Sequence, residues 1–144
     1  MKLESTKKII NGDVYNIEEA EKIAVGTNLA LDGEASIDEL RYYAETRGEF
    51  VAEILYKTAN GYYLIYSIGG NRSHYAEEYV TGMGAGSDIR LVDKKNIVSW
   101  MEQYNLVDDF QKFMRKYPAV WYHNNMSCGT QVFVGFIKLR LGRP

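Results

Sequence analysis

The sequence EFVAEILYKTANGYYLIYSIGG, from Glu49 to Gly70, decides the fold. It contains two runs rich in aromatic and β-branched residues, which favour β-strands. The Asn60-Gly61 pair between the runs is the preferred sequence of a two-residue hairpin turn, because both residues tolerate positive φ. Pairing outward from that turn places Thr58 opposite Tyr63. Neither run alternates strictly between apolar and polar residues, so we expect both faces of this hairpin to be partly covered.

A second Asn-Gly pair lies near the start of the chain, in KIINGDVYNIEEAEKIA. Asn11-Gly12 predicts another hairpin turn between two short strands. Asn16 then stands where a helix N-cap belongs, and Glu19 follows three residues later, close to a capping box. The apolar residues that follow recur at helical spacing: Ile17, Ala20, Ile23 and Ala24. The stretch therefore predicts a hairpin followed by a helix.

Three further helices are predicted downstream. Ser36 and Glu39 match the capping box of a helix that runs from Ile37 to about Thr46. Apolar spacing predicts two more helices, at about 94–104 and 107–117, and residues 130–141 resemble a strand. The glycines of TGMGAGS predict a mobile or tightly turned loop at 82–86. We expect an α+β fold in which an antiparallel sheet built from hairpins carries helices packed on one face.

The composition is that of an ordinary globular domain. The 144 residues are 46% hydrophobic and 25% charged, and we expect one domain, 1–144, with a hairpin module at 7–80 and an extension at 81–144. The 12 tyrosines suit half-buried sheet faces and protein interfaces. Neither a signal-peptide pattern nor an apolar run of about 18 residues is present, so we expect a cytoplasmic protein.

Catalytic and metal signatures are weak. The glycine run fits neither a phosphate-binding loop nor a dinucleotide fingerprint. His123 lies five residues before Cys128, so a thiol nucleophile activated by this histidine is one hypothesis. A lone cysteine is more often a small buried residue, and one Cys with two distant His residues makes a poor zinc site. We therefore expect a protein that is not an enzyme and that uses no metal or cofactor.

Charge is distributed unevenly along the chain. All 19 acidic residues lie at or before Asp109, which gives residues 1–109 a charge of −8 and residues 110–144 a charge of +6. Such asymmetry indicates an electrostatic partner, unless the two parts pack together and mix their charges. The acidic part could bind a basic groove, whereas the basic part could bind a phosphate backbone.

Two motifs resemble short proteins carried by phages and integrative mobile elements of Gram-positive bacteria. The first comprises Lys8, Ile9, Ile10, Asn11, Gly12, Tyr15, Glu18, Ala20 and Ile23. The second comprises Glu53, Leu55, Tyr56, Lys57, Thr58, Gly61, Tyr63, Ile65, Tyr66, Gly69 and Gly70. The likeness covers roughly residues 7–80 and carries no catalytic residues. It implies a mobile-element setting, in which small acidic proteins inhibit host defence, including CRISPR effectors.

The leading hypothesis is an inhibitor that binds a host nucleic-acid-handling protein, such as a CRISPR effector, and occludes its site. Aromatic and acidic residues around the glycine run form the expected partner-binding patch: Tyr75, Glu77, Glu78, Tyr79 and Asp88. The alternative is a nucleic-acid-binding accessory protein that uses basic and aromatic residues near the C-terminus. These are Lys112, Arg115, Lys116, Trp121, Lys138 and Arg140.

Overall fold

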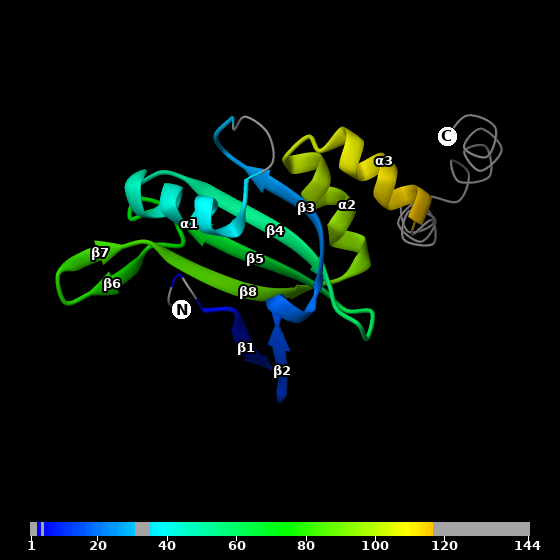
Figure 1. Cartoon of the computed structure of the whole chain (residues 1–144), viewed down its shortest axis with the longest axis horizontal. Helices are drawn as coiled ribbons and strands as arrows, with labels where there is room; N and C mark the ends of the chain where they lie inside the picture. Colours follow the sequence, from blue (N-terminus) through cyan, green and yellow to red (C-terminus); the bar gives the residue numbers. More distant parts are fainter. Residues whose placement is uncertain (1–2, 4, 31–34, 117–144) are drawn as a thin grey trace. The chain divides into compact units, whose positions relative to one another are not determined.

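The computed structural model describes residues 3, 5–30 and 35–116, and contacts divide the chain into two compact units, Met1–Val92 and Asp93–Pro144. The described part of the second unit holds α2 (Lys94–Gln103) and α3 (Val107–Lys116). The first unit holds β1 (Lys7–Ile10), β2 (Asp13–Asn16), a short 3-10 turn η1 (Ile17–Glu19), β3 (Glu21–Thr27), α1 (Ile37–Thr46), β4 (Val51–Lys57), β5 (Tyr63–Gly69), β6 (Glu77–Tyr79), β7 (Gly82–Gly84) and β8 (Gly86–Val92), as Figure 1 shows. The expected α+β fold is confirmed.

The main sheet has the strand order β3-β4-β5-β8, with every neighbouring pair antiparallel. The predicted β4–β5 hairpin is present, but its register differs from the prediction by one residue: Tyr63 pairs with Lys57 and not with Thr58. Thr58 instead closes a longer loop, because its N–H donates to the carbonyl of Tyr62 and its hydroxyl accepts from the N–H of Tyr62. Loop length fixes hairpin register, and a one-residue slip changes which side chains share a face.

The helix predicted at 17–24 was wrong. Asn16 does act as a cap, since its side-chain oxygen accepts from the N–H of Glu18 at 3.0 Å. Only the single turn η1 follows, and Ala20 already has an extended backbone. The chain then forms β3, which pairs along β4. A helix of two turns is marginally stable on its own, whereas β3 gains its pairing with β4, so the tertiary context outweighs the helical spacing.

Helix α1 begins as predicted. Ser36 and Glu39 form a complete capping box, with both hydrogen bonds 3.1 Å long. Figure 1 shows α1 lying across one face of the four-stranded sheet. Leu40 and Ala44 are buried in a core with apolar residues of three strands, among them Ile54, Tyr66 and Ile89. The two central strands are buried on both faces over most of their length, as their mixed sequence pattern indicated.

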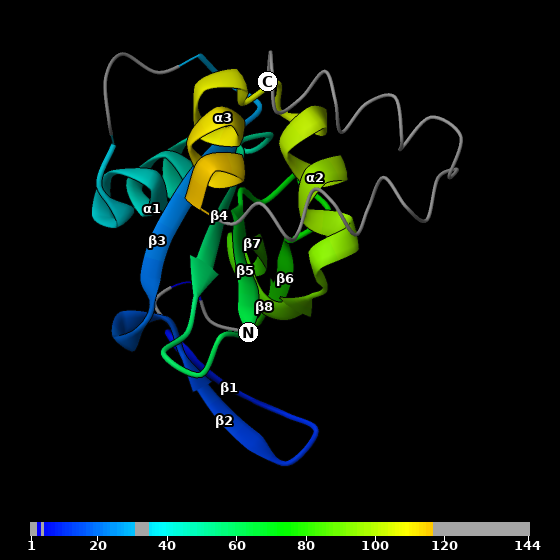
Figure 2. The same ribbon diagram turned by 90° about the vertical axis from the view of Figure 1, so that its right-hand side faces the viewer.

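Two small hairpins extend from the sheet. The β1–β2 hairpin turns at Asn11 and Gly12, which both have positive φ, as predicted. Figures 1 and 2 show this hairpin projecting from one side of the first unit. A salt bridge of 2.6 Å between Lys8 and Asp88 joins it to β8. The β6–β7 hairpin is inserted between β5 and β8 and extends from one end of the sheet (Figure 1).

The second unit begins with α2 and α3, close to their predicted bounds. Asp93 caps α2 by accepting from the N–H of Asn96 at 2.9 Å. Ile97, Trp100 and Met101 are buried on α2, and Phe113 is buried on α3. Among the helices of residues 3–116 that the structure describes, none has the length and apolar character to cross a bilayer. The strand expected at 130–141 lies outside the described residues.

Candidate protein-binding hairpin

The β6–β7 hairpin corrects the interpretation of the glycine run as a loop. Gly82 and Gly84 belong to β7, and Gly86 is the first residue of β8. Tyr79 pairs with Gly82 across the turn made by Val80 and Thr81. The φ of Gly82 is 120°, a backbone conformation that residues with a Cβ rarely adopt. The first glycine therefore makes the turn possible.

The second glycine receives the ring of Tyr79. A Cβ placed on Gly84 would lie 2.6 Å from this ring, so the phenyl group lies directly against the Gly84 backbone. The Tyr79 hydroxyl donates to the carbonyl of Ala85 at 2.7 Å, and it shares this proton with the carboxylate of Glu77, 3.1 Å away. This one aromatic side chain holds the two strands together. Two strands of three residues need such a contact, because an isolated two-stranded hairpin is only marginally stable.

The tip of the hairpin is apolar and exposed. Val80 is fully exposed, with 107% relative accessibility, and Met83 is 55% exposed. Tyr79 is 39% exposed. Glu78 is also exposed, and it pairs across the strands with Met83. Exposed β-branched and thioether groups beside a carboxylate form a surface that another protein can cover. We call Tyr79, Val80 and Met83 the hairpin tip.

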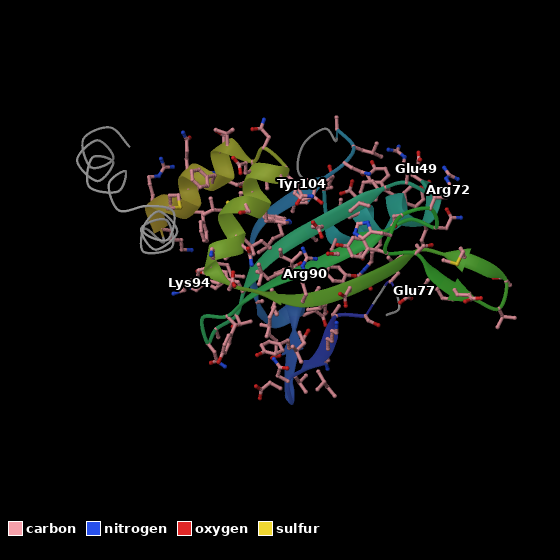
Figure 3. The ribbon with its side chains drawn as sticks, turned by 180° about the vertical axis from the view of Figure 1, so that it is seen from behind. Glu49, Arg72, Glu77, Arg90, Lys94 and Tyr104 are labelled. Atoms are coloured by element: carbon pink, nitrogen blue, oxygen red, sulfur yellow. The ribbon has the colours of Figure 1, made fainter. Side chains whose placement is uncertain are left out.

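A buried polar cluster braces the base of the hairpin. Glu53 lies in the middle of β4 and is only 4% exposed. Its Oε2 atom accepts hydrogen bonds from Ser67 at 2.8 Å, from Tyr75 at 2.5 Å and from Arg90 at 3.1 Å. Ser67 comes from β5, beside β4, and Arg90 comes from β8, the next strand beyond β5 (Figure 3 labels Arg90). Tyr75 belongs to the segment that leads into β6. The cluster therefore fixes that segment to the sheet.

The electrostatics of the cluster keep Tyr75 and Arg90 protonated, so that both can donate hydrogen bonds to Glu53. Burial raises the pKa of Tyr75, and the hydrogen bond to the Glu53 carboxylate raises it further, although Ser67 and Arg90 act in the opposite direction. Burial alone lowers the pKa of Arg90, but Glu53 and Tyr75 together raise it above its ordinary value. Tyr75 thus remains a hydrogen-bond donor and Arg90 a cation, as a buried carboxylate needs.

A second contact holds the base of the hairpin. A Cβ on Gly86 would lie 2.1 Å from the carbonyl oxygen of Tyr75, so the backbone before β6 lies against β8 at a point where only glycine fits. Because Tyr75 is fixed by its side chain and by this backbone contact, the hairpin leaves the sheet in a defined direction.

The five residues predicted for partner binding separate into two groups. Glu77, Glu78 and Tyr79 form β6 of the hairpin. Tyr75 bonds to Glu53 inside the brace, and Asp88 is paired with Lys8, so these two have structural contacts of their own. That these residues bind a partner stays a prediction.

Sequence reasoning missed Val80, Met83, Glu53 and Arg90. A signal for the brace was present, because Glu53 is a charged residue within an apolar strand and a buried charge needs a partner. The partner could not be identified, since Tyr75 and Arg90 lie 22 and 37 residues away along the chain. The tyrosines of the described residues are divided between surface and core: Tyr42, Tyr62 and Tyr79 are exposed, whereas Tyr56, Tyr63 and Tyr66 are buried.

The residues of the nucleic-acid hypothesis are located only in part. Lys112, Arg115 and Lys116 lie on α3, which also carries Asp108 and Asp109 in its first turn. Residues 93–116 together hold five basic and four acidic side chains, so this stretch is nearly neutral. Trp121, Lys138 and Arg140 lie outside the described residues, as do His123 and Cys128. Within residues 3–116, as far as they are described, no group of three or more potential metal ligands is found.

Comparisons with known protein families, with curated proteins and with solved structures find no match.

Proposed function

We propose that the chain is a non-enzymatic binding protein that docks on a host nucleic-acid-handling protein through the β6–β7 hairpin and thereby occludes its site. The observation that carries this proposal is the full exposure of Val80 at the tip of a hairpin that is braced at its base. An apolar group that protrudes on a rigid support suits insertion into a pocket of a partner. The resemblance to mobile-element proteins supplies the setting, inside the cytoplasm of a host cell.

The rigidity of the hairpin favours binding. Covering a valine or methionine side chain contributes about 1.5–3 kcal/mol, and this gain is easily cancelled when a mobile loop must be ordered. Tyr79 is already held by hydrogen bonds to Ala85 and Glu77, and the base is held by the Tyr75–Glu53 bond. Little conformational freedom is left to lose in the hairpin, so most of the apolar gain remains available for affinity.

Charge selects the kind of partner. Residues 1–92 carry 15 acidic and 9 basic side chains, a net charge of −6, and residues 93–144 carry +4. Glu78 is exposed beside the hairpin tip and has no ion-pair partner among the described residues. A pocket rimmed by basic residues, as on a protein that holds a nucleic-acid backbone, would be complementary to this surface. The chain's first unit is negatively charged, as nucleic acid is. When it occupies such a pocket, the nucleic acid is excluded.

A competition experiment tests this function. A purified, guide-loaded CRISPR effector is incubated with labelled target DNA and increasing amounts of the full chain, and the bound DNA is measured by gel shift. We expect the full chain to reduce DNA binding and a Glu78→Lys/Val80→Asp variant to leave it intact. If both proteins leave DNA binding unchanged, this effector is not the partner, and if both inhibit equally, the hairpin is not the contact.

The nucleic-acid alternative has its own test. Direct binding of the chain to labelled DNA or RNA without the effector would weaken steeply with rising salt. A shift at low salt that disappears in a Lys112→Glu/Arg115→Glu variant would favour this alternative over the proposed inhibitor.

A further inference from the structure

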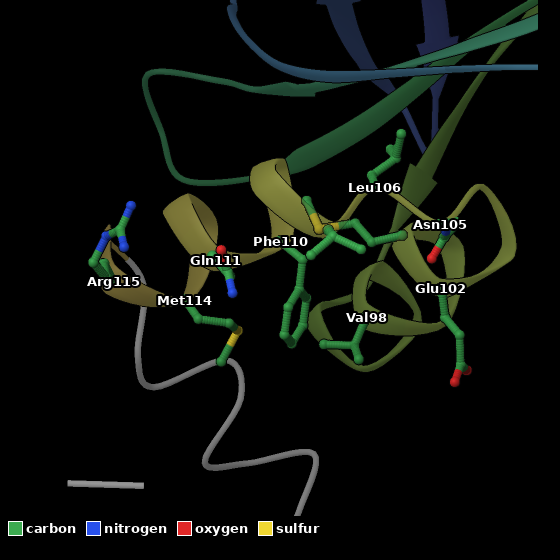
Figure 4. A pocket seen from close by; sticks show the side chains of 10 residues that line it. Val98, Glu102, Asn105, Leu106, Phe110, Gln111, Met114 and Arg115 are labelled. Carbon is green, nitrogen blue, oxygen red and sulfur yellow. The ribbon is translucent and has the colours of Figure 1, made fainter. Parts of the chain in front are cut away.

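The two helices of the second unit leave an apolar groove that the proposed function does not use. A cavity of about 850 Å³ lies between α2 and α3. Figure 4 shows the side chains of Val98, Phe110 and Met114 turned toward one another in it. All three are only partly buried, and so is Leu106, which also lines the groove. Polar groups stand at its border, with Glu102 and Arg115 on opposite sides of the view in Figure 4.

We infer that the occupant of this groove is the chain's own segment QVFVGFIKLRL, residues 131–141. Seven of its eleven residues are apolar: Val132, Phe133, Val134, Phe136, Ile137, Leu139 and Leu141. An apolar groove and an apolar segment of the same chain both lower the free energy by leaving water together. The two charges within the segment, Lys138 and Arg140, are basic, which suits the carboxylate of Glu102 at the border.

The length of chain between groove and segment permits this contact. α3 ends at Lys116, and Arg115 and Met114 in its last turn line the groove. The fourteen residues 117–130 span at most roughly 45 Å when extended, whereas a ten-residue helix is about 15 Å long. The segment can therefore return along the whole groove.

Residues 117–130 also favour binding of the segment within one molecule over binding of the segment from a second copy. A short connection gives an effective concentration in the millimolar range, far above the concentration of other copies in a dilute solution. The groove is thus filled within one chain, and the basic residues of the segment are held beside α2 and α3.

Photo-cross-linking of the full chain tests the inference. Gln111 and Lys112 are neighbours on α3 and both are exposed, but only Gln111 lines the groove. Replacing Gln111 with p-benzoylphenylalanine changes no buried side chain, and the same replacement of Lys112 is the matched control. We expect mass spectrometry to map the Gln111 cross-link to residues 131–141 within one chain, at least about five-fold more often than the Lys112 cross-link.

Three results would overturn the inference: equal cross-linking from both positions, cross-links that map to another segment, or cross-links that join two copies. A second measurement needs no cross-linker. The Phe136→Asp/Ile137→Asp variant should bind an apolar fluorescent dye several-fold more than the natural chain, because the groove is vacated. Dye binding that stays the same in a variant with unchanged circular dichroism also contradicts the inference. Neither measurement depends on the hairpin or on its partner.

Discussion

The hydroxyl of Tyr75 donates a 2.5 Å hydrogen bond to the carboxylate of Glu53, and this contact connects the segment before the β6–β7 hairpin to a buried charge in the centre of the sheet. The carboxylate also accepts from Ser67 and Arg90. Since a buried carboxylate is stable only when it is bonded, the sheet and the hairpin depend on each other.

The Tyr75→Phe substitution should reduce the free energy of unfolding by about 1–3 kcal/mol, because it removes a hydrogen bond to a charged, buried acceptor. Tyr42→Phe is the matched control, since Tyr42 is 63% exposed and should change stability by less than about 0.5 kcal/mol. Urea unfolding followed by circular dichroism measures both. Equal effects of the two substitutions would mean that the Tyr75 hydroxyl does not stabilise the fold.

Arg90→Met should also destabilise the chain, by about 1–3 kcal/mol, because Glu53 loses its cation. This is less than the loss for a fully buried pair, since 41% of the Arg90 side chain is exposed. Tyr75 and Arg90 bond to the same oxygen atom, so their effects should not add. A double-mutant cycle measures the coupling, and a coupling energy near zero would argue against a shared cluster.

Stability should decline at alkaline pH. Burial raises the pKa of Tyr56 to about 12, with a further rise from Tyr66 and an opposing effect of Arg41. A tyrosine whose pKa is raised on folding stabilises the fold fully below the unfolded pKa of about 10, and this contribution is lost as pH rises toward 12. Tyr75 acts in the same direction. Urea unfolding between pH 9 and 12 should show this decline, and Tyr56→Phe should make it shallower.

Gly84→Ala should displace the ring of Tyr79, because the new Cβ would lie 2.6 Å from it. The ring can swing outward, so we expect a small loss of global stability but a clear local change. In proton NMR spectra the Gly84 α-protons should be shifted by the overlying ring, and Tyr79→Leu should abolish this shift. Unshifted Gly84 protons in the natural chain would show that the ring does not cover this residue.

Local signals in the sequence predicted the elements that depend on local contacts. The Ser36–Glu39 capping box and the Asn11-Gly12 turn lie within a few residues, and both were confirmed. Where pairing with a distant strand decides the structure, local signals failed. Residues 21–24 follow a helical spacing but form part of β3, and the extra turn residues at Thr58 shifted the β4–β5 register.

The candidate site was predicted in part for the same reason. The sequence indicated the acidic and aromatic hairpin residues Glu77, Glu78 and Tyr79, because they are contiguous. It could not indicate that the Tyr79 ring lies against Gly84 or that the Tyr75 backbone lies against Gly86. Glycine is required at both positions because of contacts that form only in the folded chain. Nor could the sequence indicate that Asp88 is paired with Lys8, 80 residues earlier.

The Lys8–Asp88 ion pair determines which charge reversals can test the acidic hairpin. Replacing Glu77, Glu78 and Asp88 together by lysine should lower the affinity for a CRISPR effector. Asp88→Lys, however, also places a second cation beside Lys8 of β1. Glu78→Lys alone changes the hairpin charge without disturbing that contact. We expect it to slow association and to lower affinity more at low salt than at high salt. An affinity loss that is independent of salt would contradict an electrostatic role of Glu78.

The most direct test of the hairpin as the docking element is a pair of matched valine substitutions, measured as the Kd of the full chain for a purified, guide-loaded CRISPR effector. Val80 and Val14 are both exposed valines on projecting hairpins, β6–β7 and β1–β2. We predict that Val80→Asp raises Kd at least about ten-fold, whereas Val14→Asp leaves it within two-fold of the natural chain. An effector that binds the natural chain and the Val80→Asp variant equally well would contradict the account.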